Sequence, residues 1–232
     1  MAINASNSGG SNVPVIEAGT YPARCIQVVH VGTVPDEYQG KKTTPNKVRI
    51  AWELPTELYK FDEVRGAEPR IISKEYTLSL SDKANLRKDL DAWRGKPFTE
   101  DELKGFDVSK ILGQPCQLSI LNGIGVTSQK PYAKIAAVAK VMKGVTVADQ
   151  VLDSVLFMYD LPIAELIEVF KSVPEYVQDK IVTSAEWAAL KIERPVSEST
   201  EDESEGTTPS DEVAEAIAEG ADAGTDADEP PF

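Results

Sequence analysis

Residues 47–54 read KVRIAWEL, and this stretch decides the class of fold. Its large apolar side chains fall on alternate positions: Val48, Ile50, Trp52 and Leu54. An alternation with a period of two is typical of a strand that buries one face against a core. The stretch therefore predicts a half-buried β-strand in which Trp52 belongs to the core and the intervening residues face outward.

Four further strand-like runs lie on either side of this stretch. They cover residues 21–31 (YPARCIQVVHV), 71–80, 115–121 and 132–141. The segments between them, at 32–45, 55–70 and 122–131, carry the Gly, Pro, Asp and Asn residues that mark turns, and we expect loops there. The sequence thus predicts five short strands over about 125 residues.

One amphipathic helix is predicted between the third and fourth strands. Leu86, Leu90 and Trp93 follow one another at helical spacing and form one apolar stripe. Ser81 can cap the start of this helix, and Gly95 can end it. The resulting order, β-β-β-α-β-β, is that of a five-stranded OB-fold barrel, although other small barrels also use short strands.

The chain beyond the barrel predicts short helices followed by a disordered end. Pro162 can begin one helix, Ser172 can cap a second, and Thr183 with Glu186 fits a capping box for a third. These helices can pack on the barrel or fold only on contact with a partner. Four segments result: a flexible N-terminal arm (1–18), the OB-fold domain (19–143), a small helical segment (144–194) and a disordered acidic tail (195–232).

Charge is distributed unevenly along the chain. Residues 1–143 carry 20 basic and 16 acidic residues, whereas residues 144–232 carry 4 basic and 22 acidic ones. The net charge of −14 therefore hides a mildly basic body and a strongly acidic end, an asymmetry typical of an interaction tail. The tail has too little apolar surface to offset the entropy of ordering it.

Several classes of function find no support in the residue types present. One histidine, His30, and two separated cysteines, Cys25 and Cys116, do not make a zinc site, and no phosphate-binding glycine motif occurs. We expect a non-enzymatic protein without cofactor or metal, with both thiols buried and reduced. A signal peptide and a membrane-spanning run are both absent from the sequence, which predicts a cytoplasmic location and no membrane partner.

Particular segments resemble a known group of proteins. The runs YPARCIQVVHVG, NKVRIAWELP, ISKEYTLSLSDKANLRKDLDAWRGKPFTEDELKGFD and LGQPCQLSI resemble bacteriophage single-stranded DNA-binding proteins with an OB-fold, over roughly residues 17–142. The end DADEPPF is similar to the acidic tips by which bacterial and phage proteins of this kind dock onto replication and repair enzymes. Pro230 stands where an apolar residue is usual. The resemblance implies a partner-binding tip formed by Asp228, Glu229, Pro230, Pro231 and Phe232.

DNA-contacting residues are predicted from physical requirements, because the resemblance supplies no contact map. Single-stranded DNA needs cations for its phosphates and aromatic platforms for its bases. Side chains of both kinds gather on the predicted strand faces and loops: Arg24, Tyr38, Lys41, Lys42, Lys47, Arg49, Lys74, Tyr76, Lys130, Tyr132 and Lys134. Tyr76 fits a core position equally well. Tyr59 and Phe61 favour a plug between loop and core over a stacking platform.

The sequence therefore predicts a protein that coats and protects single-stranded DNA in phage replication or recombination. Its tip would recruit a polymerase, helicase or nuclease, and its own state would be monomer or dimer. The alternative is an acidic DNA mimic or interaction module that acts on a host nucleic-acid enzyme. An enzyme or an oligosaccharide-binding OB domain is a third reading, which neither a catalytic set nor the tail supports.

Overall fold

The structure is a computed structural model of the 232-residue chain, and it describes residues 13–38, 40–62, 66–126 and 128–195. Most of the predicted N-terminal arm and the acidic tail with its partner-binding tip lie outside these residues. Within the described parts, no helix has the length and apolar character needed to cross a bilayer.

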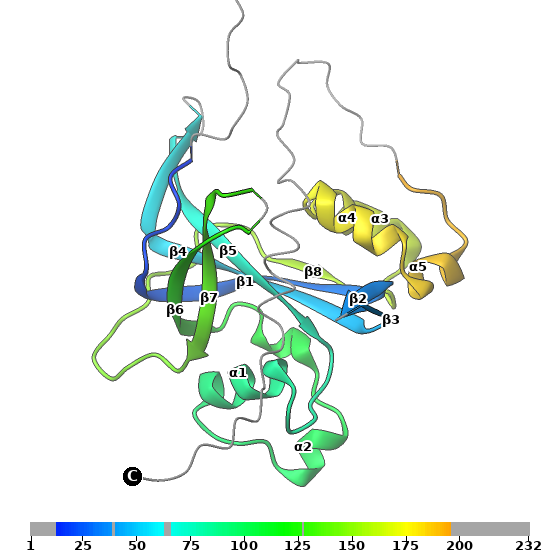
Figure 1. The fold of residues 1–232 in the computed structure, drawn as a ribbon, viewed down its shortest axis with the longest axis horizontal. Helices are drawn as coiled ribbons and strands as arrows, with labels where there is room; N and C mark the ends of the chain where they lie inside the picture. The colour runs from blue at the N-terminus through cyan, green and yellow to red at the C-terminus, as the bar shows by residue number, and fades with distance from the viewer. Residues whose placement is uncertain (1–12, 39, 63–65, 127, 196–232) are drawn as a thin grey trace, which may run out of the picture.

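The molecule is built on one curved, mainly antiparallel sheet (Figure 1). Its strands follow the order β5-β4-β1-β6-β7, and β8 pairs in parallel with the second half of β1. No hydrogen-bonded ladder joins β5 to β7 in the described chain, so the barrel is not closed. The strands are β1 (Gly19–Thr33), β4 (Asn46–Asp62), β5 (Gly66–Thr77), β6 (Pro115–Ile124), β7 (Pro131–Ala139) and β8 (Val155–Phe157).

The expectation of a mainly β chain with a helix after its third long strand is confirmed. The expected loop at 55–70 is wrong, because β4 and β5 continue through it as a paired hairpin with Leu58 opposite Pro69. The expected loop at 32–45 contains a small hairpin of its own, formed by β2 (Asp36–Tyr38) and β3 (Lys41–Thr43). The sheet therefore extends further than sequence alternation indicates.

The first core lies inside the curve of the sheet. It joins the inward side chains of the five long strands to α1 (Asn85–Arg94), which lies beside β5 and β7. Trp52 and Trp93 are both buried there as expected, with their ring centroids 5.9 Å apart. Helix α2 (Glu100–Lys104) and the 3-10 helix η1 (Val108–Ile111) follow and lead the chain into β6.

The boundaries of α1 confirm one expected cap and correct the other. Gly95 ends the helix with a left-handed φ of 67°, which a residue with a side chain adopts only at a cost. Ser81 does not cap the helix, because the chain makes a turn first and Ala84 occupies the N-cap position without a side-chain hydrogen bond.

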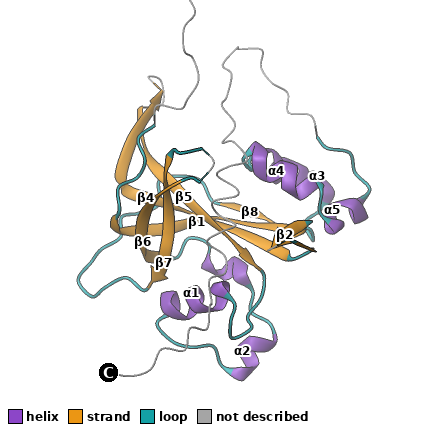
Figure 2. Cartoon of the chain, viewed as in Figure 1, coloured by secondary structure: helices purple, strands orange, loops and turns teal. Residues whose placement is uncertain are grey.

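A second core lies on the outer face of β1 (Figure 2). Helices α3 (Ile163–Lys171), α4 (Glu175–Val182) and α5 (Ala185–Leu190) bury Phe170, Val177 and Trp187 against Val29 and Val31 of the strand. The helical segment therefore packs on the sheet. Its caps differ from those expected: Ser184 caps α5, accepting a hydrogen bond from the Trp187 backbone N–H, whereas Ser172 and Thr183 end the preceding helices.

Two charged side chains, half-buried Arg24 and buried Glu53, hold the long connector between β7 and β8 against the sheet. Arg24 donates to the carbonyl oxygens of Gly113 and Ala148, at 2.8 and 3.0 Å. The Glu53 carboxylate, fully buried, accepts from the backbone N–H groups of Val151 and Leu152 at 3.0 and 2.9 Å. A buried charge satisfied in this way fixes the connector rather than destabilising the fold.

Candidate nucleic-acid interface

The sheet register places two hairpin arms at one end of the molecule. Gly19, at the start of β1, lies opposite Ile120 of β6, and Arg24 lies opposite Glu53 of β4. Both neighbouring strands run antiparallel to β1, so the β4–β5 turn and the β6–β7 turn leave the sheet at the end where β1 begins (Figure 1). We call the hairpin segments 55–62 with 66–71 the first arm, and 121–134 the second arm.

The first arm carries an aromatic cluster. The rings of Tyr59 and Phe61 meet edge to face with centroids 5.0 Å apart, and the Arg70 guanidinium lies 5.8 Å from the Tyr59 centroid. Phe61 is 47% exposed, and Tyr59 is half-buried. Neither reaches the core, so the sequence-based preference for a core plug is wrong.

The second arm carries Tyr132 between two exposed lysines, Lys130 and Lys134. Tyr132 pairs across the hairpin with Gly123, and its ring lies directly over that glycine. A Cβ at Gly123 would come within 2.8 Å of the ring, so only glycine lets the tyrosine lie flat on the strand. Leu121 lies opposite Lys134 and is half-exposed beside it.

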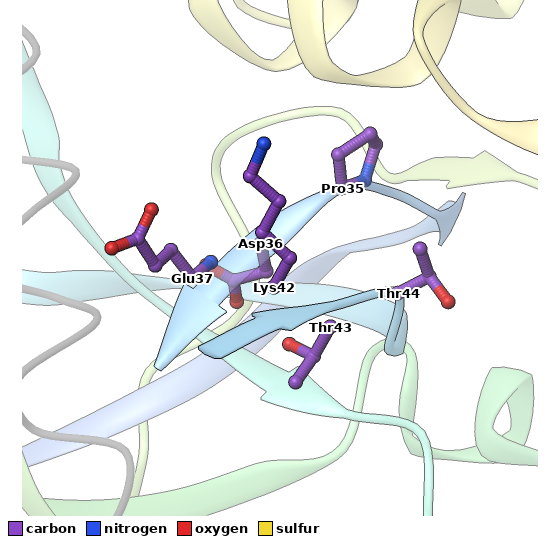
Figure 3. A pocket seen from close by; sticks show the side chains of 6 residues that line it. All are labelled: Pro35, Asp36, Glu37, Lys42, Thr43 and Thr44. Carbon is purple, nitrogen blue, oxygen red and sulfur yellow. The ribbon is translucent and has the colours of Figure 1, made fainter. Parts of the chain in front are cut away.

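Lys41 and Lys42 are exposed as well, but they lie at the opposite end of β1. This strand has 15 residues, which corresponds to at most about 48 Å along its path, so these lysines lie far from the arms. Lys42 lines an open pocket of about 600 Å³ on the β2–β3 hairpin, opposite Glu37 in the register (Figure 3). Because carboxylates share this pocket, it does not form a purely basic surface.

Lys47 and Arg49 point outward as expected, yet helix α4 covers them. The Arg49 side chain is buried, donates to Ser73 Oγ and the Tyr176 hydroxyl at 2.8 Å each, and also reaches Gln27. Lys47 pairs with Asp36 at 2.7 Å and Glu75 at 3.0 Å. These two cations differ from the expectation, since neither presents an open surface to a phosphate.

The charges of the ion-paired side chains covered by α4 balance one another. Although burial alone lowers the pKa of Lys47, the Glu75 and Asp36 carboxylates raise it overall. Although burial alone raises the pKa of Glu75, Lys180 of α4 and Lys47 together hold it below its ordinary value. The charges on this face therefore bind the helix to the sheet.

Lys74 and Tyr76 share the inward side of β5. Both reach the same carboxylate oxygen of Asp89 on α1, at 2.8 Å each. Tyr76 is a core residue, and burial raises its pKa well above the ordinary value. Tyr76 thus takes the core position that the sequence left open beside a DNA contact, and Lys74 is held in an ion pair with Asp89.

The remaining residues expected at DNA or partner contacts either have a structural role or lie outside the described part of the molecule. Arg24 serves the connector described above. The side chain of Tyr38 and the tip residues Asp228 to Phe232 lie outside the described part of the molecule. Sequence reasoning did not include the first arm, where Arg70 lies beside the rings of Tyr59 and Phe61. The sequence does hold a signal for this cluster, because Tyr59 and Phe61 are two positions apart and therefore share one face of a strand.

Two further findings concern metal binding and similarity to known proteins. Among the described residues, no group of three or more His, Cys, Asp or Glu side chains is placed to hold a metal ion. Comparison of the chain with protein-family models and with curated protein sequences finds no match.

Proposed function

We propose that the chain binds single-stranded DNA across its two arms, with bases stacked on Tyr59, Phe61 and Tyr132 and phosphates held by Arg70, Lys130 and Lys134. The observation that carries the proposal is that aromatic rings and cations occur together on both arms, at the same end of the sheet: exposed Phe61 with half-buried Tyr59 and Arg70 on the first, and half-buried Tyr132 between exposed Lys130 and Lys134 on the second. Each base stacked on an aromatic ring contributes about 1–3 kcal/mol, and this requires unpaired bases.

The architecture supports this proposal at the level of the fold. Five long antiparallel strands with β1 at the centre, a helix between the third and fourth, and an unclosed seam between β5 and β7 fit a partly open, five-stranded OB barrel. In our proposal the protein is not an enzyme: it coats single-stranded DNA during phage replication or recombination, and its acidic tip recruits a replication enzyme.

The decisive experiment is a titration with fluorescently labelled oligo-dT at two salt concentrations, with duplex DNA as competitor. We expect Tyr59→Ala and Phe61→Ala each to weaken binding about 5- to 150-fold, the range that one lost stack implies. Leu58→Ala is the matched control, because this residue is 58% exposed on the same arm but has no ring. Equal losses in all three variants would contradict the stacking role.

The two lysines of the second arm have a separate signature. Lys130→Ala and Lys134→Ala should each reduce the slope of log affinity against log salt by about one, because each removes one phosphate contact. Lys104→Ala serves as control, since Lys104 is paired with Asp101 at 2.6 Å. If a chain ending at residue 195 shows no binding even at low salt, the DNA-binding proposal fails and the DNA-mimic alternative takes its place.

A further inference from the structure

A second site lies at the other end of the molecule from the arms. An open pocket of about 410 Å³ lies here, lined by the second half of β1, the beginning of β4, the segment after α2 and the strand β8. Its floor and walls are mainly apolar, formed by Val48, Leu78 and Leu156 with the rings of Phe106 and Tyr159. A volume and lining of this kind are typical of small-molecule sites at barrel mouths.

The polar groups of this pocket are hydrogen-bond acceptors. The carboxylate of Asp160 is exposed at the pocket and has no hydrogen bond or ion pair within the described chain. Asp107 accepts from the Ser109 N–H and hydroxyl through one oxygen, at 3.0 and 2.6 Å, which leaves its second oxygen free. Since the Ser109 hydroxyl is already donating, it too can only accept from a ligand.

The histidine of the pocket is hydrogen-bonded to the first residue of β4. His30 Nε2 lies 2.8 Å from Asn46 Oδ1, and an amide oxygen only accepts, so Nε2 carries the proton. In the neutral ring Nδ1 is then an acceptor without a described partner. The Tyr159 ring meets the histidine edge to face at 5.2 Å, while the Tyr159 hydroxyl is occupied by the carbonyl oxygen of Val31.

We propose that this pocket binds an organic cation: a flat apolar group that carries a protonated amine or guanidinium. The apolar walls would take the flat group, and the acceptors at the rim would take its N–H donors. Phe106 and Tyr159 supply aromatic rings, whose negative faces favour a cation in an apolar setting. Neither lysine nor arginine lines the pocket in the described chain, and no ion pair is described for Asp160, whereas Lys110 beyond the pocket acts electrostatically on Asp107.

Charge excludes two other occupants. The phosphates of DNA would meet the carboxylates of Asp107 and Asp160, and neither lysine nor arginine lines the pocket in the described chain. The chain's own tail carries 13 acidic residues and no basic residue between positions 195 and 232, so it offers no positive group to the pocket. The site is thus independent of the proposed DNA binding, and a failure of either proposal leaves the other standing.

The test uses three probes with the same ring system and different charge. Tryptamine, indole and indole-3-acetate would be titrated into the full chain while the methyl resonances of Leu78 and Leu156 are followed by NMR. We expect saturable shifts with tryptamine and binding of indole-3-acetate at least about tenfold weaker, because a carboxylate replaces the cation. The capped dipeptide Trp-Arg identifies the source of the cation: tighter binding than tryptamine indicates a partner peptide, and weaker binding a free amine.

A charge-removing variant tests the role of the rim. Asp160→Asn should weaken tryptamine binding about threefold, the size of an exposed ion pair, whereas Asp153→Asn should not, because Asp153 is exposed just before β8 and does not line the pocket. Oligo-dT affinity should be the same in both variants and in the presence of tryptamine. Equal affinity for tryptamine and indole-3-acetate, or no saturable shift with tryptamine, would overturn the proposal.

Discussion

Gly32, near the end of β1, illustrates how closely the helical segment fits the sheet. Its φ of +93° is one that side-chain-bearing residues rarely adopt, and a Cβ there would come within 2.8 Å or less of Glu186, Ser184 and Tyr159. We expect Gly32→Ala to lower the free energy of unfolding by about 2–4 kcal/mol, since backbone strain and overpacking add.

The matched control separates these two causes. Gly144→Ala has a similar φ of +87° with nothing within 4 Å of the new Cβ, so only backbone strain applies. Urea denaturation of both variants measures the difference. If the two losses are the same, the fit of α5 against β1 contributes nothing at this position.

The two cysteines give a pH-dependent prediction. Burial raises the pKa of Cys25 to about 12, and burial also raises the pKa of Cys116. Once the pH exceeds about 9, the unfolded thiols lose protons that the folded ones retain, so stability falls at up to about 1.4 kcal/mol per pH unit for each thiol. Urea denaturation between pH 8 and 11 measures this slope, and replacing both cysteines by alanine should reduce it.

Single side chains also mark the limit of inference from sequence. The alternation around Trp52 identified a core residue correctly because burial of one strand face leaves a direct pattern. Arg49 lies on the opposite face, and no local pattern reports that Tyr176, 127 positions later, covers it. Outward residues are therefore predictable, but whether they remain open to solvent depends on distant segments of the chain.

At the scale of elements, one carboxylate joins α1 to β5. Asp89 accepts from both Lys74 and Tyr76, and Tyr76 is buried. We expect Asp89→Ala to cost about 1–3 kcal/mol, because it leaves a buried hydroxyl without its acceptor. Asp82→Ala should cost under about 1 kcal/mol, since Asp82 is 90% exposed and pairs only with Arg87. Thermal melts followed by circular dichroism compare the two; similar losses would contradict the link.

The boundaries of the elements were predicted least well where no core lies beneath them. The first arm has a register shift between Leu54 and Leu58, and beyond it Pro69 is the one buried position among the described residues of the arm. Residues 55–60 alternate only between half-buried and exposed positions, so the alternation of large side chains is limited to Tyr59 and Phe61 and the segment resembles a loop. The caps of α4 and α5 were displaced by one or two residues because several Ser, Thr and Pro residues in this region suit a helix start.

The whole molecule has two cores that share β1. The helical segment covers Val29, Val31 and Val34, and it supplies Phe157 and Phe170 to the same cluster. A chain ending at residue 143 would expose these valines, whereas a chain ending at residue 195 keeps both cores. We expect the shorter fragment to aggregate or unfold and the longer one to melt cooperatively, as measured by size-exclusion chromatography and circular dichroism. A stable monomeric fragment 13–143 would contradict the shared core.

The small strand β8 has a consequence for synthesis of the protein. Gln27 to Val29 of β1 pair with Val155 to Phe157 of β8. One of the first strands to leave the ribosome therefore has no hydrogen-bonding partner on this edge until one of the last strands has been synthesised. About 125 residues must be translated before that backbone edge is satisfied, and at about 5–20 residues per second this takes several seconds or more. During this interval the nascent chain exposes an unpaired edge beside an apolar face, which is the kind of surface that chaperones bind.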